Sequence, residues 1–217
     1  TSKEGLEKML SECSVGWALY PHDDVFNEND IQKSFKAALL NWLDEYEAAM
    51  MEEIVYNAVN LAKKIRVDFI EKPQYILVDE FQDLNKLEQE FVNLLGARSK
   101  LVLVVGDPDQ SIYSFKYAHP DGIKYFAESD DVESHTLEYS VRCAKKIINI
   151  ANQLLKQADP GRTELLQPLP DAMDGEVFFK GENMQEDEFN FVLNSIVKKV
   201  KCGVDPEEII VLVPRNE

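Results

Sequence analysis

The chain has 217 residues, of which 45% are hydrophobic and 10% are aromatic. This length exceeds one typical domain and this composition can build a hydrophobic core, so we expect one large or two smaller folded units. The 23 basic and 40 acidic residues give a formal net charge of −17. That charge argues against nucleic-acid binding over the whole surface, although it leaves room for a local basic or aromatic groove.

The cysteines, the histidines and the apolar runs argue against three further classes of protein. Cys13, Cys143 and Cys202 are odd in number and far apart, which indicates reduced thiols and a cytoplasmic location rather than a disulfide framework. The three histidines are equally scattered, so we expect no zinc site. No apolar run approaches the roughly 20 residues of a membrane span, and we expect neither a membrane segment nor a signal peptide.

Residues 1–72 are predicted to be helical. A short amphipathic segment comes first, and a helix then runs from its expected cap, Asp30, to Leu43. A further helix is expected over residues 46–65, and its methionine-containing apolar stripe is typical of a core rather than of a ligand site. Pro73 ends the helical region and introduces a strand.

Between residues 73 and 157 the pattern changes to strands that alternate with helices. Two apolar runs, at residues 75–78 and 101–105, are typical of strands that are buried on both faces of a parallel sheet. Asn85 and Glu88 form the pattern of a capping box at the start of a helix over residues 86–95. The other predicted elements are a short helix at 121–127, a solvated acidic loop at 128–133, a weak third strand at 135–139 and a helix at 143–157.

Residues 158–175 are rich in proline and glycine and are predicted to be a linker. Beyond them, a strand at 176–180, a helix at 186–200 and a strand at 209–213 are expected to form a βαβ unit. Asp205 and Pro206 fit the N-cap and first position of a one-turn helix before the last strand. A βαβ unit with so few strands is not expected to be a complete domain, so we expect the chain to be part of a longer protein.

Polar groups follow each of the three predicted strands. Asp79 and Glu80 come directly after the first, a polar turn from Gly106 to Gln110 follows the second, and Arg142 follows the third. Open α/β sheets bind ligands beyond the carboxyl ends of their strands. Carboxylates for a metal, a group that orients water and a cation for phosphate charge are the parts that phosphoryl transfer needs. Two solvated acids at a strand end remain the alternative interpretation.

The sequence motifs at these strand ends resemble those of one enzyme family. Residues 77–83 (LVDEFQD) resemble the Walker B segment of UvrD/Rep/PcrA-type superfamily 1A DNA helicases. Residues 105–116 (VGDPDQSIYSFK) resemble their motif III, and residues 137–143 (LEYSVRC) occupy the place of motif IV. The resemblance covers roughly residues 70–217. It implies an α/β fold with a RecA-like, P-loop NTPase-type parallel sheet and flanking helices.

The resemblance also implies a domain organisation. Residues 1–72 would be the tail of an inserted 1B-like helical subdomain and the lead-in to RecA-like domain 1A, and residues 73–157 would be the second part of that domain. Residues 158–175 would be a linker, and residues 176–217 the start of RecA-like domain 2A. The phosphate-binding loop GxxxxGK[ST] occurs nowhere in the chain. The resemblance therefore implies an internal fragment that hydrolyses no ATP alone.

Carried over position by position, the resemblance implies a site for ATP and Mg²⁺. Asp79 would hold Mg²⁺ with Glu80 beside it, and Glu80 would polarise the attacking water. Gln82 would sense the γ-phosphate, and Gln110 would couple the nucleotide to the DNA site. Arg142 would reach the γ-phosphate as an arginine finger. These five residues are the predicted catalytic set, in which Asp79, Glu80, Gln110 and Arg142 also bind the nucleotide.

Tyr113, Phe115 and Lys116 would contact single-stranded DNA by stacking and charge. The family's Trp, Arg and Gly are Phe115, Lys116 and Tyr117 here, so this contact is expected to be weaker or differently aimed. The family's adenine-stacking Tyr is Val141, which leaves stacking at that position open. The alternatives are that Gln110 is an ordinary turn residue, that Arg142 forms a surface salt bridge and that Phe115 belongs to the core.

The expected function is a part of an ATP-dependent DNA helicase that couples ATP hydrolysis to movement on single-stranded DNA and to duplex unwinding. Its expected partners are single-stranded DNA or a single-strand/duplex junction, with DNA repair or replication proteins as further partners. One alternative is an inactive helicase-like scaffold or DNA-binding module, which the acidic charge, Val141 and Lys116 favour. Another is an ATPase subunit of a helicase–nuclease.

Overall fold

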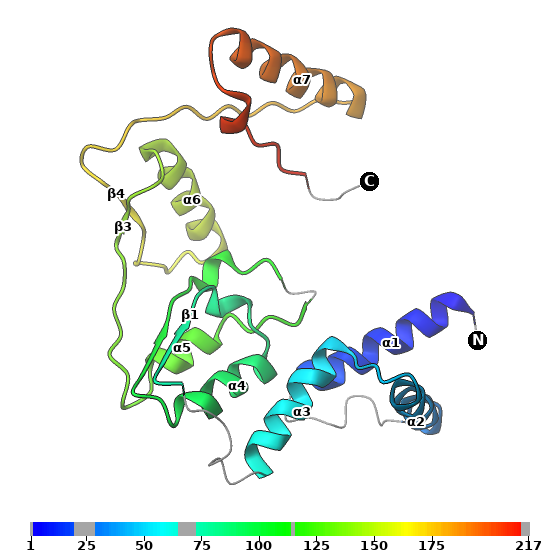
Figure 1. Ribbon diagram of the computed structural model, residues 1–217. Coiled ribbons are helices and arrows are strands. Elements are labelled where there is room, and N and C mark those ends of the chain that lie inside the picture. Colours follow the sequence, from blue (N-terminus) through cyan, green and yellow to red (C-terminus); the bar gives the residue numbers. More distant parts are fainter. Residues whose placement is uncertain (1, 20–28, 65–72, 114–115, 214–217) are drawn as a thin grey trace. The chain divides into compact units, whose positions relative to one another are not determined.

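The computed structural model describes residues 2–19, 29–64, 73–113 and 116–213 (Figure 1). These residues form a mixed α/β structure with seven α-helices and two small parallel sheets. The chain divides into two compact units, Thr1–Ser134 and His135–Glu217. The domain boundaries expected from the family resemblance stay a prediction.

The first unit begins with three helices, α1 (Lys3–Ala18), α2 (Asp30–Glu45) and α3 (Met51–Lys64). Cys13 and Trp17 of α1 are buried where these helices meet. Partly buried side chains from the helices and from the start of α3 pack against this pair, namely Met9, Phe35, Leu39, Met50 and Tyr56. The predicted helical character of this region is confirmed, and its apolar stripes form a core.

The two predicted helix starts in this region are wrong in detail. The N-cap of α2 is Asn29 rather than Asp30, because Asn29 has an extended backbone and its Oδ1 accepts a hydrogen bond from Gln32 N at 2.9 Å. α3 starts at Met51 rather than near residue 46. Glu47 takes a left-handed conformation with φ 49°, and Ala48 N donates to Leu43 O at 2.8 Å, which closes α2 with a tight turn. Residue 65, the predicted end of α3, lies outside the described residues.

The sheet of the first unit consists of β1 (Tyr75–Val78) and β2 (Leu101–Val104), paired in parallel along their full length. α4 (Lys86–Gly96) connects them, and α5 (Gly122–Ala127) follows β2 (Figure 1). Residues 128–133, after α5, form the predicted loop without a helix or strand. The parallel pairing confirms that the two polar strand ends share one edge of the sheet.

Only one face of this sheet is covered within the part of the chain that the structure describes. Ile76, Val78, Val102 and Val104 are half-buried, and Gly96 of α4 lies directly against Val102. The side chains on the other face, Tyr75, Leu77, Leu101 and Leu103, are 50% to 72% exposed. Successive side chains of a strand point to opposite faces, and here only one of the two faces is covered. The prediction of strands buried on both faces is therefore wrong for these residues.

α4 has the capping box that the sequence predicts. Asn85 Oδ1 accepts from Glu88 N at 2.9 Å, and Glu88 Oε2 accepts from Asn85 N at 2.8 Å. The helix also packs against α3, where Lys63 Nζ lies 2.6 Å from Glu90 Oε1. The start of α4 is thus fixed by its own cap, and the body of the helix is held against α3.

The second unit contains β3 (Tyr139–Ser140), α6 (Lys145–Ala158), β4 (Gln167–Pro168) and α7 (Gln185–Lys201). β3 and β4 form a parallel pair of two residues each. A one-turn 3₁₀ helix, η6 (Pro206–Glu208), follows with Asp205 as its N-cap, since Asp205 Oδ1 accepts from Glu207 N at 3.0 Å. The two predicted helices and this predicted turn are confirmed.

Three strand predictions fail in the second unit. The third strand lies at Tyr139–Ser140 rather than at residues 135–139, and it pairs with β4 instead of the sheet formed by β1 and β2. Residues 176–180 and 209–213 form no strand, so the predicted βαβ unit is wrong here. An extended segment becomes a strand only when a neighbouring strand accepts and donates its hydrogen bonds, and no described segment pairs with either stretch.

Of the helices in the described ranges, none combines the length and the apolar character that crossing a membrane requires.

Candidate functional site

The carboxyl ends of β1 and β2 are held together beyond the last paired residues of the strands. Val105 N donates to Val78 O at 2.8 Å, and Phe81 N donates to Val105 O at 3.0 Å. Asp79 and Glu80 lie between these two contacts and are exposed. The two acids therefore sit beside the polar turn that follows β2, as the sequence predicts.

Glu80 has a strained backbone. Its φ of 53° and ψ of 42° place it in the left-handed region, which disfavours a residue with a Cβ by about 1–2 kcal/mol. Glu80 N donates to Asp79 Oδ1 at 2.9 Å, and Asp83 N donates to Glu80 O at 2.9 Å at the end of the 3₁₀ helix η3 (Phe81–Asp83). Strain of this kind persists where surrounding contacts enforce it, and it is common at functional sites.

Gln82 links the two strand ends through a single buried amide. Its side chain is 1% exposed; Nε2 donates to Glu80 Oε2 at 2.6 Å, and Oε1 accepts from Asp107 N at 3.0 Å. Gly106 makes this approach possible, since a Cβ at that position would overlap Gln82 Oε1. Gln82 therefore orients the Glu80 carboxylate and fixes the start of the turn after β2.

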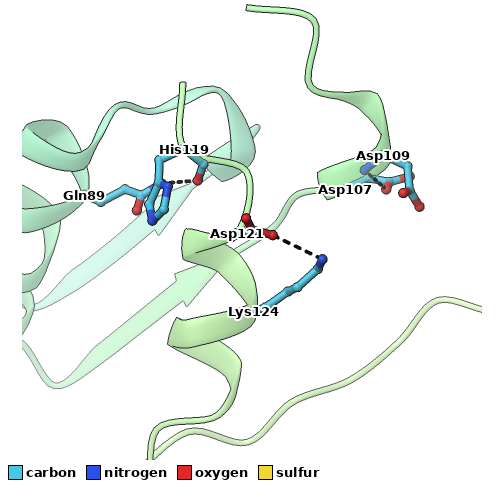
Figure 2. Close-up of polar contacts among 6 residues, drawn as sticks. All are labelled: Gln89, Asp107, Asp109, His119, Asp121 and Lys124. Carbon is cyan, nitrogen blue, oxygen red and sulfur yellow. Dashed lines mark hydrogen bonds and ion pairs between the residues drawn. The ribbon is translucent and has the colours of Figure 1, made fainter. Parts of the chain in front are cut away.

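Asp107 extends the same hydrogen-bonded chain to Gln110. Asp107 Oδ2 accepts from Gln110 Nε2 at 2.8 Å. Asp107 Oδ1 accepts from Asp109 N at 3.0 Å, a contact that Figure 2 shows. Both contacts lie in or next to the 3₁₀ helix η4 (Pro108–Gln110), of which Asp107 is the N-cap. We call the chain Glu80–Gln82–Asp107–Gln110 the strand-end network.

The sequence predicts three members of the strand-end network, Glu80, Gln82 and Gln110, but not Asp107. The signal was present, because an aspartate directly before a proline is typical of an N-cap followed by the first helical position. The Gln110 side chain donates to a carboxylate three residues earlier in the same turn, and its coupling role stays a prediction.

The acidic pair fits a magnesium ion that shares its ligands with phosphate. Mg²⁺ is typically bound by one or two carboxylates together with phosphate oxygens and water. Asp79 and Glu80 are exposed, so each can present carboxylate oxygen to a ligand at the sheet edge. Within the described residues no group of three or more His, Cys, Asp and Glu side chains could hold a metal alone. The donor set therefore suits a metal that arrives with a nucleotide.

The predicted DNA-binding residues lie after η4 in the first unit. Lys116 Nζ is 5.0 Å from the centroid of the Tyr113 ring, a cation–π contact. Phe115 lies outside the described residues, so its role stays a prediction. Tyr117, at the position of the family's glycine, takes the left-handed conformation that a glycine adopts easily, with φ 59°.

Arg142 belongs to the second unit, where it directly follows Val141 after β3. Both side chains are exposed. Cys143 N donates to Ser140 Oγ at 3.1 Å, so a local turn carries the arginine. The convergence of Arg142 with Glu80 stays a prediction.

The family model and the relatives that match this chain belong to the same helicase family. The model of the UvrD/REP helicase N-terminal domain matches residues 18–131. The ATP-dependent DNA helicase PcrA of Staphylococcus aureus (strain Mu50) is 33% identical over 180 residues, which are 80% of this chain and 24% of that protein. PcrA of Staphylococcus epidermidis (strain ATCC 12228) is 30% identical over 205 residues, which are 90% of this chain and 28% of that protein.

The chain thus spans about a quarter of the length of these relatives. The family model covers more than half of the 217 residues, and it includes both strand ends and the whole strand-end network. The chain belongs to the UvrD/Rep helicase family.

Proposed function

We propose that this chain is part of an ATP-dependent DNA helicase or translocase, in which the ends of β1 and β2 form one side of the ATP site. The observation that carries the proposal is the strand-end network. It joins Glu80, the acid at the first strand end, to Gln110, which is three residues from Tyr113. Membership of the family and the similarity to two ATP-dependent DNA helicases support it.

In this proposal Glu80 accepts a proton from the attacking water. A general base must present its oxygen in one orientation, and the 2.6 Å bond from Gln82 Nε2 provides that orientation. Asp79 holds the magnesium ion, which supplies positive charge to the phosphate oxygens when it is bound. Arg142 of the second unit supplies a further positive charge for the γ-phosphate.

Gln82 senses the nucleotide indirectly in this proposal. Both polar atoms of its side chain already have partners, namely Glu80 Oε2 and Asp107 N. A shift of the Glu80 carboxylate would therefore reach Asp107 through one rigid amide, and Gln110 through the Asp107 carboxylate. Gln110 then transmits the state of the nucleotide toward Tyr113 and Lys116, which contact single-stranded DNA or a single-strand/duplex junction.

The 217-residue chain is proposed to be inactive alone, because no GxxxxGK[ST] loop is present in its sequence to bind the β- and γ-phosphates. The test is ATP turnover by the purified chain with Mg²⁺ and oligo-dT, which should not exceed the background of the assay. Turnover that disappears in Glu80→Gln would contradict this part of the proposal.

The activity itself is tested in the longer protein that contains this chain. Glu80→Gln should lower kcat for single-stranded-DNA-stimulated ATP hydrolysis by about 10²-fold or more, because it removes a general base. Glu128→Gln, at an exposed position after α5, should change kcat less than about twofold. If the longer protein lacks the phosphate-binding loop and shows no DNA-stimulated turnover, the scaffold function is supported instead.

A further inference from the structure

Gln89 of α4 is a buried polar residue outside the predicted site. Its side chain is 7% exposed, and Nε2 donates to two backbone carbonyls, Leu84 O at 3.1 Å and His119 O at 2.8 Å. Figure 2 shows the Gln89 side chain directed at His119. Leu84 follows η3 and therefore lies just beyond Glu80, whereas His119 lies just beyond Lys116. One amide group thus joins the two functional stretches of the first unit.

Backbone contacts reinforce this junction. His119 N donates to Leu84 O at 2.8 Å, and Asn85 and Ala118 form an isolated antiparallel bridge. Ala118 N in turn donates to Tyr113 O at 3.4 Å, and Lys116 N donates to the same oxygen at 2.9 Å. The position of the Tyr113 backbone is therefore connected to the end of η3 by a short chain of hydrogen bonds.

Gly122, the first residue of α5, encloses the Gln89 amide from a third side. A Cβ at Gly122 would overlap Gln89 Oε1, and it would also lie 2.5 Å from both Cδ and Nε2. The glycine therefore lets the first turn of α5 approach the amide closely. Because the amide is enclosed by α5 and bonded to two carbonyls, its orientation is fixed.

We propose that Gln89 is a positioning residue that holds the stretch with Tyr113 and Lys116 in register with the strand end that carries Asp79 and Glu80. Gln89 acts only through the carbonyls of Leu84 and His119. The consequence for catalysis rests on the proposed function: the register set by Gln89 determines how strongly DNA bound at Tyr113 and Lys116 stimulates hydrolysis at Glu80.

The register itself is tested by hydrogen–deuterium exchange of the 217-residue chain. Gln89→Met keeps the length of the side chain but removes the hydrogen bonds to Leu84 O and His119 O. His119 N donates to the same Leu84 O, so loosening of this junction should make exchange of the His119 amide about tenfold faster. Asn93→Met, at an exposed position on the same helix, should leave that rate unchanged. Unchanged protection of His119 in Gln89→Met would overturn the proposal.

A second variant separates the proposed contact from general loosening. Gly122→Ala displaces the Gln89 amide without removing it, and it should also accelerate exchange at His119. The double variant should exchange no faster than the faster single variant, because both changes break one contact. If the two accelerations instead multiply, Gly122 acts independently of Gln89 and the proposal fails.

The functional consequence is measured in the longer protein as the oligo-dT concentration that gives half-maximal stimulation of ATP turnover. Gln89→Met should raise this concentration by about fivefold or more, within the usual range of coupling between two sites. Faster exchange at His119 with an unchanged half-maximal concentration would refute the role in coupling. If the protein with its native Gln89 shows no DNA-stimulated turnover, the proposed function fails, while the exchange rates still decide the positioning role.

Discussion

The strand-end region of the first unit and the helices of the second unit are organised in opposite ways. Among the described residues, every buried polar side chain lies in the first unit, namely Gln82, Asn85 and Gln89. In the second unit α7 has no buried residue, and Phe178 and Phe179 are exposed. Polar burial requires hydrogen-bond partners in fixed places. The first unit therefore holds buried polar side chains in fixed places, whereas α7 and the segment before it leave their apolar side chains uncovered.

The two units also differ in which residues adopt a left-handed backbone conformation. The described non-glycine residues with positive φ, Glu47, Glu80 and Tyr117, all belong to the first unit. In the second unit the positive φ values belong to Gly175 and Gly203, which adopt them easily. Strain in a folded chain persists only where other contacts enforce it. The region around the strand ends must therefore be rigid enough to hold Glu80 and Tyr117.

The largest expected effect concerns the apolar cores. Leu87 of α4 is 0% exposed, so Leu87→Ala should lower the free energy of unfolding of the first unit by about 2–5 kcal/mol. Leu193 of α7 is 47% exposed, and Leu193→Ala should cost less than about 1 kcal/mol. Urea denaturation measures both, with fluorescence of Trp17 and Trp42 for the first unit and circular dichroism for α7. Equal losses would show that the second unit has a core as tight as the first.

The next effect concerns crowding at the strand-end network. Gly106→Ala would push a methyl group against Gln82 Oε1 and within 3.2 Å of Phe81 N, so it should destabilise the first unit by about 1–3 kcal/mol. A methyl group added at Gly181 of the second unit would meet no described atom within 4 Å, and Gly181→Ala should change stability by less than about 1 kcal/mol. Equal urea midpoints for the two alanine variants would contradict the contrast between the units.

The strain at Tyr117 is tested by a pair of variants that differ in one methyl group. Tyr117→Gly should be more stable than Tyr117→Ala by about 1 kcal/mol, because only glycine tolerates φ 59° without steric repulsion. Tyr125, inside the helix α5, should show the opposite order, with alanine more stable than glycine by about 0.5–1 kcal/mol. Thermal or urea unfolding of the four variants measures the two differences. The same order at both positions would exclude strain at Tyr117.

The smallest expected effect is a dependence on pH at the Gln89 junction. Burial lowers the pKa of His119 from 6.5, and the positive charge of Lys86 lowers it further, whereas Asp121 opposes the change. The unfolded chain then binds a proton that the folded chain does not, so the first unit loses stability as the pH falls through about 6.5 toward the folded pKa. His119→Gln should reduce the loss between about pH 7.5 and pH 5.

A charge variant serves as the control for this effect. Lys86→Gln removes the repulsive charge and should reduce the same pH-dependent loss by a smaller amount, because burial is the larger cause of the shift. The free energy of unfolding at the two pH values, from urea titrations, gives the comparison. An identical pH dependence in the native chain and in His119→Gln would contradict the burial of this imidazole.

The sequence alone determined the features that depend on neighbours in the chain. Helix periodicity located α2, α4, α6 and α7 to within a few residues, and side-chain caps identified the starts of α4 and η6 correctly. A helix makes its hydrogen bonds between residues four apart, so its signal is contained in a short stretch of sequence. The motifs at residues 77–83 and 105–116 likewise indicated the family.

Only the tertiary structure decided which distant groups meet. The extended segments at residues 176–180 and 209–213 have the composition of strands, yet they have no neighbour to pair with among the described residues. The bonds from Gln82 to Asp107 and from Gln89 to His119 join residues 25 and 30 positions apart. Such contacts depend on how strands and helices pack, and for that reason a single sequence indicated Asp79, Glu80 and Gln82 but neither Asp107, which Gln82 contacts, nor the contact of Gln89 with His119.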